Sequence, residues 1–310
     1  MLNNVNPVGI SACPITSNLK SIQKYNSPEY GLITFKSVRS HKYKGNPPPH
    51  LVYINSSKIL NKNDIGKVIF SSDKYTPKYF SIANSYGVSS LEPSEWIEEF
   101  ERTQKILFPN QKLILSIYPS IASGNSIIQD IVKLCDYVSQ TTAEIVEINL
   151  TCPNTNSQLI FQNLELSSHL IKITKEKLNK KLIFAKIGIF NNSLEMYKFI
   201  DLNNNLNGIS SINSIPMQVK NTNNNITFGE DRPTAGVSGY IINKLSKTQA
   251  KKLVVIRNKI IRKSPLYIIG IGGISDLNDG YRYIEETKVD FAQFSSRLML
   301  EFINDEKKIS

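Results

Sequence analysis

The segment of this sequence with the clearest chemical potential is Asn149–Asn154, which reads N-L-T-C-P-N and follows the apolar run Ala143–Ile148. A thiol beside two carboxamides can take a proton from a polar, planar ligand. Asparagine both donates and accepts hydrogen bonds, so several asparagines can bind a heterocyclic imide and its carboxylate without adding charge. The alternative is an ordinary turn after a strand, because Asn and Pro are common in turns and Cys is often buried. The elements around the segment decide between the two interpretations.

Short apolar runs alternate with helical patterns along the chain, which is typical of parallel strands covered by helices. The expected strands are Gly31–Phe35, Tyr79–Ile82, Lys112–Ile117, Ala143–Ile148, Lys181–Lys186, Gly208–Ile212, Leu266–Gly270 and Asp290–Phe294. The expected helices are Pro93–Ile106, Asn125–Ser139, Leu164–Leu178, Ser193–Leu202, Ser246–Arg262 and Asp276–Thr287. Eight such strands in 310 residues predict an α/β fold with one TIM (β/α)8 barrel domain over residues 1–310. Val38–Lys67 and Pro216–Thr234 are expected as long loops inserted over the C-terminal face of the barrel.

Polar residues or glycines stand where most of these strands end. They are Lys36-Ser37, Asn84–Gly87, Asn149–Asn154, Lys186, Asn213-Ser214, Gly270–Gly273 and Ser295-Ser296. In a TIM barrel the active site is built at this rim. Lys36 and Lys186 either extend to solvent or hold a negative charge in the barrel mouth, as would suit a reduced flavin.

The segment Gly270–Ile274 predicts a phosphate site. It lies between an apolar strand and Ser275-Asp276, a plausible helix cap, and glycines let backbone amides approach a phosphate closely. Ser295-Ser296 follows the next strand, so the two segments together occupy the common phosphate position of this fold. Ala235–Gly239 is expected as a further glycine-rich loop, suited to a flat ring or a phosphate chain. A plain tight turn is the alternative for the first segment.

The formal charge of +11 would suit nucleic-acid binding, but the lysines are scattered rather than interleaved with aromatic residues on one face. We therefore expect no nucleic-acid partner, and a charge that attracts an anionic cofactor and substrate.

Membrane, metal and disulfide classes are not expected either. No run approaches ~18 apolar residues, and no signal peptide is visible at the N-terminus. The three cysteines, Cys13, Cys135 and Cys152, form no C-x-x-C pair, which argues against a metal site and a disulfide framework. A reduced, cytoplasmic setting fits best.

These features resemble the class 1 dihydroorotate dehydrogenases over nearly the whole chain. The resemblance rests on Thr34–Ser37, Gly45–Pro49, Asn84–Gly87, Asn149–Asn154, Lys186, Ile212–Ser214, Gly236–Gly239 and Gly270–Ile274, in the order and spacing of that family. It implies an FMN-dependent TIM barrel that oxidises dihydroorotate to orotate in pyrimidine synthesis. Related flavin chemistry on another dihydropyrimidine, and a barrel that binds without turnover, are the alternatives.

The resemblance also implies a role for each matching residue. Cys152 would take the C5 proton of dihydroorotate, and Lys36 would act beside it while the C6 hydride passes to flavin N5. The substrate would contact Lys36, Asn84, Tyr86, Gly87, Asn149, Asn154, Asn213 and Ser214. FMN would contact Ala12, Lys36, Ser37, Asn149, Lys186, Ile212, Gly236, Ser238, Gly239, Gly272, Gly273, Ser295 and Ser296.

With a cysteine as the base, the chain resembles the soluble class 1 enzymes. Its Gly45–Pro49 loop is most similar to that of class 1A, and this resemblance implies a homodimer and fumarate as oxidant. Four positions depart from the family pattern. Cys13 replaces a glycine against the flavin, Tyr43 and His50 stand where loop arginines are usual, and Ser295 replaces a glycine at the phosphate. Val88–Ser90 also replaces the usual Leu-Pro-Asn. We expect these changes to bear on FMN affinity, substrate choice and electron acceptor.

Overall fold

Eight parallel strands close into a barrel in the part of the chain that the computed structural model describes, residues 2–121, 124, 126–151, 159–262 and 264–309. The order around the barrel is β1-β13-β12-β9-β8-β7-β6-β2, which confirms the predicted TIM-barrel fold class. The strands are β1 (Val8–Ile10), β2 (Leu32–Val38), β6 (Lys112–Ile117), β7 (Ile145–Asn149), β8 (Leu182–Ile187), β9 (Gly208–Ser211), β12 (Tyr267–Ile271) and β13 (Phe291–Phe294).

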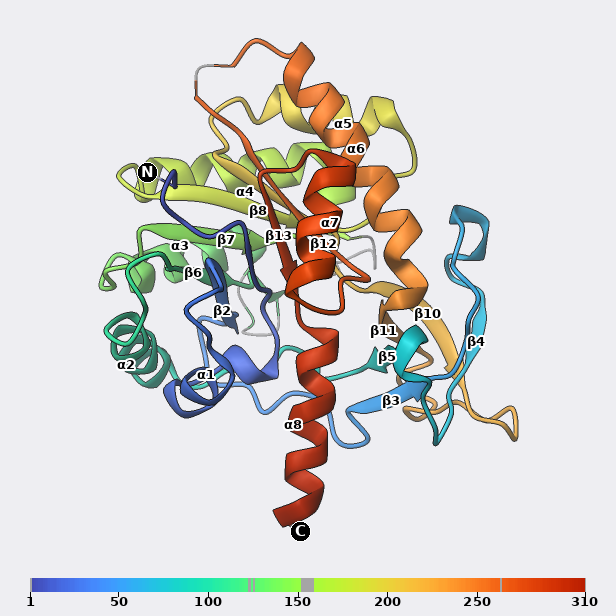
Figure 1. Cartoon of the computed structure of the whole chain (residues 1–310). Helices are drawn as coiled ribbons and strands as arrows, with labels where there is room; N and C mark the ends of the chain where they lie inside the picture. Colours follow the sequence, from blue (N-terminus) through green and yellow to red (C-terminus); the bar gives the residue numbers. More distant parts are fainter. Residues whose placement is uncertain (1, 122–123, 125, 152–158, 263, 310) are drawn as a thin grey trace.

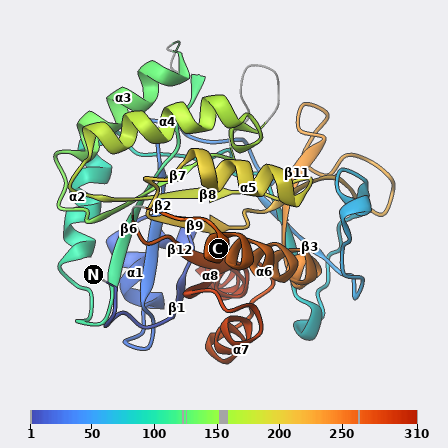
Figure 2. The same cartoon turned by 90° about the horizontal axis from the view of Figure 1, so that it is seen from above.

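Helices surround the barrel, as Figures 1 and 2 show from two directions. They are α1 (Leu19–Tyr25), α2 (Pro93–Gln104), α3 (Ile127–Val138), α4 (Leu164–Lys177), α5 (Ser193–Leu202), α6 (Asn243–Lys259), α7 (Leu277–Thr287) and α8 (Ser296–Ile309). Side chains at the N-caps accept backbone hydrogen bonds and so fix where several helices begin; examples are Ser126, Asn163, Asn192 and Asp276. Among the described residues, no helix combines the length and the apolar character that crossing a membrane requires.

One predicted barrel strand was wrong and one barrel strand was missed. The expected strand Tyr79–Ile82 forms part of β5 (Ser81–Asn84), which lies in a different sheet. Its place in the barrel is taken by β1, which pairs with β13 and β2. The sequence does not indicate β1, because this strand has only three residues and one of them is Gly9. A Cβ at that glycine would lie 2.0 Å from the Leu32 carbonyl oxygen, so the close approach of β1 to β2 depends on it.

A second sheet of five strands stands beside the barrel mouth, at the lower right of Figure 1. Its order is β3 (Leu51–Ile54), β5, β11 (Thr234–Gly239), β10 (Ile215–Lys220) and β4 (Val68–Phe70). The inserted segments are therefore not simple loops, since they supply β3 and most of β10. Ala235–Gly239 is likewise a strand rather than a loop. The sheet buries Val237, Met217 and Ala83 against the start of α6, which holds it in place.

The barrel interior is apolar at one end and polar at the other. Alternate residues of a strand face opposite sides, so Ile145, Glu147 and Asn149 of β7 share one side. Ile145 packs with interior residues such as Phe184 and Ile269 from other strands. Two residues further along, the buried Glu147 accepts a hydrogen bond from the Ser116 hydroxyl at 3.0 Å. The polar end is the C-terminal end of the strands, where the predicted site residues lie.

Candidate active site

Two adjoining pockets open at the C-terminal ends of the barrel strands. The first, which we call the glycine-rich pocket, is lined by Ser11, Ile212, Ser238, Gly239, Gly272, Gly273, Ser295 and Ser296 among others. The second, which we call the asparagine pocket, is lined by Lys36, Ser37, Asn46, Gly87, Val88, Tyr118, Asn149, Thr151 and Gly236 among others. Both pockets are bordered by Ala12, Cys13, Pro14, Asn84, Tyr86, Lys186, Asn213 and Ser214. Because they share these walls, the two pockets lie side by side.

The structure brings the predicted site residues together. Every predicted substrate or cofactor residue that it describes lines one of the two pockets. Cys152 and Asn154 lie outside the described residues, although Thr151, which precedes the cysteine, lines the asparagine pocket. In the described part of the chain, no group of three or more His, Cys, Asp or Glu side chains could hold a metal ion.

Asn149, Thr151 and Asn213 form a hydrogen-bonded cluster, which we call the asparagine cluster, across the ends of β7 and β9. The Asn213 side-chain amide donates to the Thr151 hydroxyl at 2.5 Å, and that hydroxyl donates to the side-chain Oδ1 of Asn149 at 2.6 Å. The Asn149 amide donates in turn to Ser37 at 3.2 Å. These bonds fix which amide atoms point where, so the cluster can present a set pattern of donors and acceptors to a ligand. Thr151 was not among the predicted site residues, because its role depends on Asn213 from a distant strand.

Lys186 is the second-to-last residue of β8 and borders both pockets, with only 5% of its surface exposed. Among the described residues its ammonium makes no hydrogen bond or ion pair. A buried, unpaired charge is costly, so this lysine is suited to a bound anion.

Lys36, on β2, differs because its ammonium donates to the Ser89 carbonyl. Burial, followed by the nearby positive charge of Arg39, lowers the pKa of Lys36 from 10.5 to about 8. Its charge is therefore sensitive to pH in the range where enzymes work.

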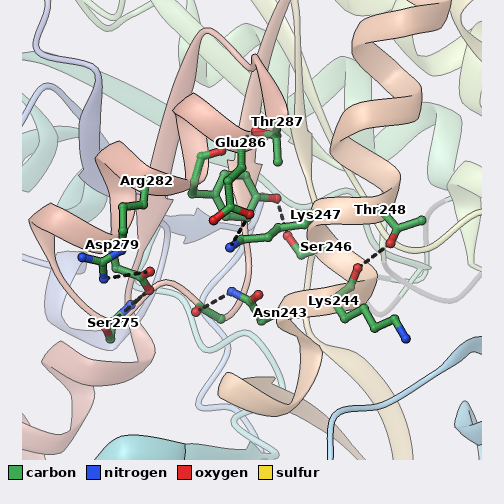
Figure 3. Close-up of polar contacts among 12 residues, drawn as sticks. Asn243, Lys244, Ser246, Lys247, Thr248, Ser275, Asp279, Arg282, Glu286 and Thr287 are labelled. Carbon is green, nitrogen blue, oxygen red and sulfur yellow. Dashed lines mark hydrogen bonds and ion pairs between the residues drawn. The ribbon is translucent and has the colours of Figure 1, made fainter.

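The glycine-rich pocket has a backbone turn at its base. Gly272 and Gly273 follow β12 with φ angles of +124° and +73°, values that L side chains rarely adopt. The Asn243 amide donates to the Gly273 carbonyl at 2.8 Å and ties the turn to α6. Further contacts join α6 to α7 behind the turn (Figure 3), including the Lys247–Glu286 ion pair at 2.9 Å. Helix α8 begins at Ser296, which lines the same pocket, so the site suits an anion such as a phosphate.

The positions that depart from the family pattern have defined surroundings. His50 stacks on Tyr86 with ring centroids 5.2 Å apart, and its Nε2 lies 2.8 Å from the Asn46 carbonyl oxygen. Tyr43 pairs with Ser90 through two backbone hydrogen bonds. Cys13 is buried where the two pockets meet, and burial raises the pKa of its thiol to about 11, so it stays protonated. Ser295 lines the glycine-rich pocket.

Comparison with known proteins also points to the dihydroorotate dehydrogenases. The sequence matches the dihydroorotate dehydrogenase family over residues 2–286. It is similar to a dihydroorotate dehydrogenase of Dictyostelium discoideum, with 28% identity over 284 residues that span 86% of this chain and 75% of that protein. It is also similar to the catalytic subunit of dihydroorotate dehydrogenase B (NAD(+)) of Petrotoga mobilis, with 27% identity over 206 residues. That match spans 66% of this chain and 63% of the relative, which is less than two thirds of it.

Among solved structures, DHODH from Eimeria tenella in complex with ferulenol superposes with a TM-score of 0.69. The alignment covers 94% of this chain and 76% of that one at 17% identity, which shows the shared fold. Fold, pocket and family match agree, and the chain therefore belongs to the dihydroorotate dehydrogenase family, the flavin enzymes that oxidise dihydroorotate in pyrimidine synthesis.

Proposed function

We propose that the glycine-rich pocket and the adjoining asparagine pocket bind FMN and (S)-dihydroorotate side by side, and that the enzyme is of class 1 with a cysteine base. The observation that carries this proposal is the buried Lys186, which borders both pockets beside Asn149 of the neighbouring strand and whose ammonium has no hydrogen-bond or ion-pair partner among the described residues. A cation held in that way fits the negative charge that a reduced flavin carries near N1.

The glycine-rich pocket has the residues that FMN requires. Gly272, Gly273, Ser295 and Ser296 would hold the phosphate with backbone amides and hydroxyls at the start of α8. Ser238 and Gly239 would follow the ribityl chain, and Ala12, Ile212 and Lys186 would lie against the ring. When bound, FMN supplies the acceptor for the hydride from C6 of dihydroorotate.

The asparagine pocket would orient the substrate for that transfer. Asn84, Asn149, Asn213 and Ser214 would hydrogen-bond the pyrimidine ring and its carboxylate, and Tyr86 and Gly87 would close over it. Lys36 would supply the positive charge that the carboxylate needs. The neutral amides would recognise the pattern of donors and acceptors on the ring, and the charge of Lys36 would attract the carboxylate.

Cys152 would be the general base that removes the C5 proton. A free thiol has a pKa near ~8.5, so it becomes an effective base as pH rises or as nearby cations stabilise the thiolate. Cys152→Ala should keep FMN yet slow flavin reduction by roughly 10²–10⁴, the usual share of general base catalysis. Cys152→Ser should retain part of the rate with a higher pH optimum.

Stopped-flow reduction by dihydroorotate measures this effect, with Cys135→Ala on α3 as the matched control. Near-normal reduction in Cys152→Ala would rule out the cysteine as the base.

Fumarate would reoxidise the flavin in the pocket that orotate leaves, giving ping-pong kinetics. Fumarate shares the planarity and carboxylate of the substrate, so the asparagine cluster and Lys36 could hold it. The specific alternative is NAD(+), reached through a partner subunit, because two of the sequence relatives are named as catalytic subunits of the NAD(+)-linked form. Stopped-flow reoxidation of the reduced enzyme decides between them. Fast reoxidation by fumarate is expected; reoxidation only by a quinone, oxygen or an added partner protein would contradict class 1A.

A further inference from the structure

Arg39 follows β2 and is buried, with 6% of its surface exposed. Its guanidinium lies 4.2 Å from the ring centroid of Tyr43 and 4.7 Å from that of Tyr118. Tyr118 lines the asparagine pocket, whereas Arg39 itself does not. A buried arginine held between aromatic rings can hardly move, so whatever it donates to is fixed in place.

The fork of this guanidinium holds two consecutive carbonyls of the pocket wall. Nε donates to the Val88 carbonyl and Nη2 to the Gly87 carbonyl, each at 2.8 Å. Both residues have positive φ, +73° at Gly87 and +55° at Val88. A β-branched residue such as valine strongly disfavours that conformation, and it persists only when surrounding contacts impose it. The contacts with Arg39 are of that kind.

The arginine is itself anchored on the opposite side. Nη1 donates to the Ser120 hydroxyl at 2.8 Å, and the backbone amide of Ser120 donates to the buried carboxylate of Asp130 on α3 at 2.8 Å. The Arg39 backbone amide donates to the Ser90 hydroxyl at 3.0 Å. Arg39 thus joins the barrel and α3 to residues 87–90.

We propose that Arg39 is a positioning residue that holds residues 87–90 in the conformation in which Gly87 and Val88 line the asparagine pocket and Ser89 accepts a hydrogen bond from the ammonium of Lys36. The link to Lys36 is direct, because Ser89, which lies between the residues that Arg39 contacts, accepts its hydrogen bond. The kinetic part of this proposal rests on the proposed function, since Gly87 and Lys36 are then substrate contacts. The structural part does not.

The test uses the FMN-loaded full chain with Arg39→Met, Arg39→Lys and, as the matched control, Arg102→Met. Arg102 lies on the exposed face of α2 and pairs with Glu99. Hydrogen–deuterium exchange of peptides covering residues 85–91 reports the segment directly; the Ser90 amide, which donates to the Tyr43 carbonyl at 2.8 Å, is one marker. Exchange should accelerate about tenfold or more in Arg39→Met, in keeping with the loss of charge-assisted hydrogen bonds. Arg39→Lys should exchange faster than the parent too, since a lysine keeps the charge but not the fork.

Kinetics provide the second measurement. In Arg39→Met the KM for dihydroorotate should rise about tenfold while FMN content stays at the parent level, because a displaced pocket wall weakens substrate binding first. Ser120→Ala, which removes one anchor of the guanidinium, should shift both measurements less in the same direction and remains informative if Arg39→Met fails to fold.

Parent-like exchange in Arg39→Met or in a folded Arg39→Lys would overturn the proposal, as would an equal change in Arg102→Met. If the parent is not reduced by dihydroorotate, the proposed function fails. Faster exchange at residues 85–91 in the Arg39 variants would even then support the positioning role.

Discussion

At the scale of single residues, we expect the charge of Lys186 to affect the reduction potential of a bound flavin. Lys186 is a buried residue and its ammonium is unpaired within the described residues, so a bound reduced flavin would gain a fixed cation there. Lys186→Met should lower the reduction potential of the bound flavin by about 30–60 mV, equivalent to roughly 1.4–3 kcal/mol of lost charge stabilisation.

Spectroscopic redox titration measures this potential. Lys181→Met is the matched control, because Lys181 precedes the same strand at its other end and bonds backbone carbonyls there. An unchanged potential in a Lys186→Met protein that retains FMN would show that the lysine is merely structural.

Lys36 predicts a pH dependence. Burial, and then the charge of Arg39, lower its pKa to about 8, so the ammonium is present well below pH 8 and is lost as pH rises through it. The value of kcat/KM for dihydroorotate, which reports the free enzyme, should therefore fall on the alkaline side of about pH 8. Lys36→Arg stays charged and should not show this decline. Lys36→Met should not show it either, but its kcat/KM should be about tenfold lower at every pH, as the loss of one charged hydrogen bond would give. A decline that persists unchanged in both variants would exclude Lys36 as its cause.

At the scale of elements, the turn after β12 depends on α6. The Ser246 hydroxyl lies 2.5 Å from the buried Tyr283 hydroxyl and donates to the Ile271 carbonyl at 2.6 Å. Ser246→Ala takes this partner from the buried Tyr283 hydroxyl and removes one of the two hydrogen bonds that the Ile271 carbonyl accepts, so it should lower the free energy of unfolding by about 1–3 kcal/mol. It should also weaken FMN retention, because the turn that we propose to hold the phosphate is supported by these contacts.

Thr248→Ala is the control, since Thr248 is an exposed residue of the same helix whose hydroxyl donates to the Lys244 carbonyl. Urea unfolding and FMN titration measure both effects. Equal losses in the two variants would contradict this role for Ser246.

The sequence predicts elements well where the signal is local. β6 was predicted with its exact bounds, because a nearly continuous apolar run marks it. β5 was predicted as a strand but placed in the wrong sheet, since nothing within Ser81–Asn84 distinguishes pairing with β3 and β11 from pairing in the barrel. β1 was missed because it is short and includes a glycine that only the neighbouring strand explains.

At the scale of the whole molecule, the polar C-terminal ends of the parallel strands lie at the same end of the barrel. For that reason the residues of the candidate site could be predicted from the sequence. What could not be predicted depends on contacts between distant segments. Arg39 contacts residues 87–90 across about 50 positions of the chain, and Thr151 contacts Asn213. Such partners carry no motif of their own.

The association state is a prediction for the whole molecule. The resemblance to class 1A implies a homodimer. Sedimentation velocity of the FMN-loaded protein should give twice the 35.0 kDa chain mass. A monomer at micromolar concentration would contradict that assignment without affecting the pocket.

The most direct test of the central claim is anaerobic titration of the purified, yellow protein with (S)-dihydroorotate. We expect the visible flavin absorbance to bleach in proportion to the dihydroorotate added, with orotate formed in equal amount, and Cys152→Ala to bleach far more slowly. A flavin that dihydroorotate leaves oxidised, while another dihydropyrimidine reduces it, would contradict the proposed substrate. A protein that binds no flavin would contradict the account as a whole.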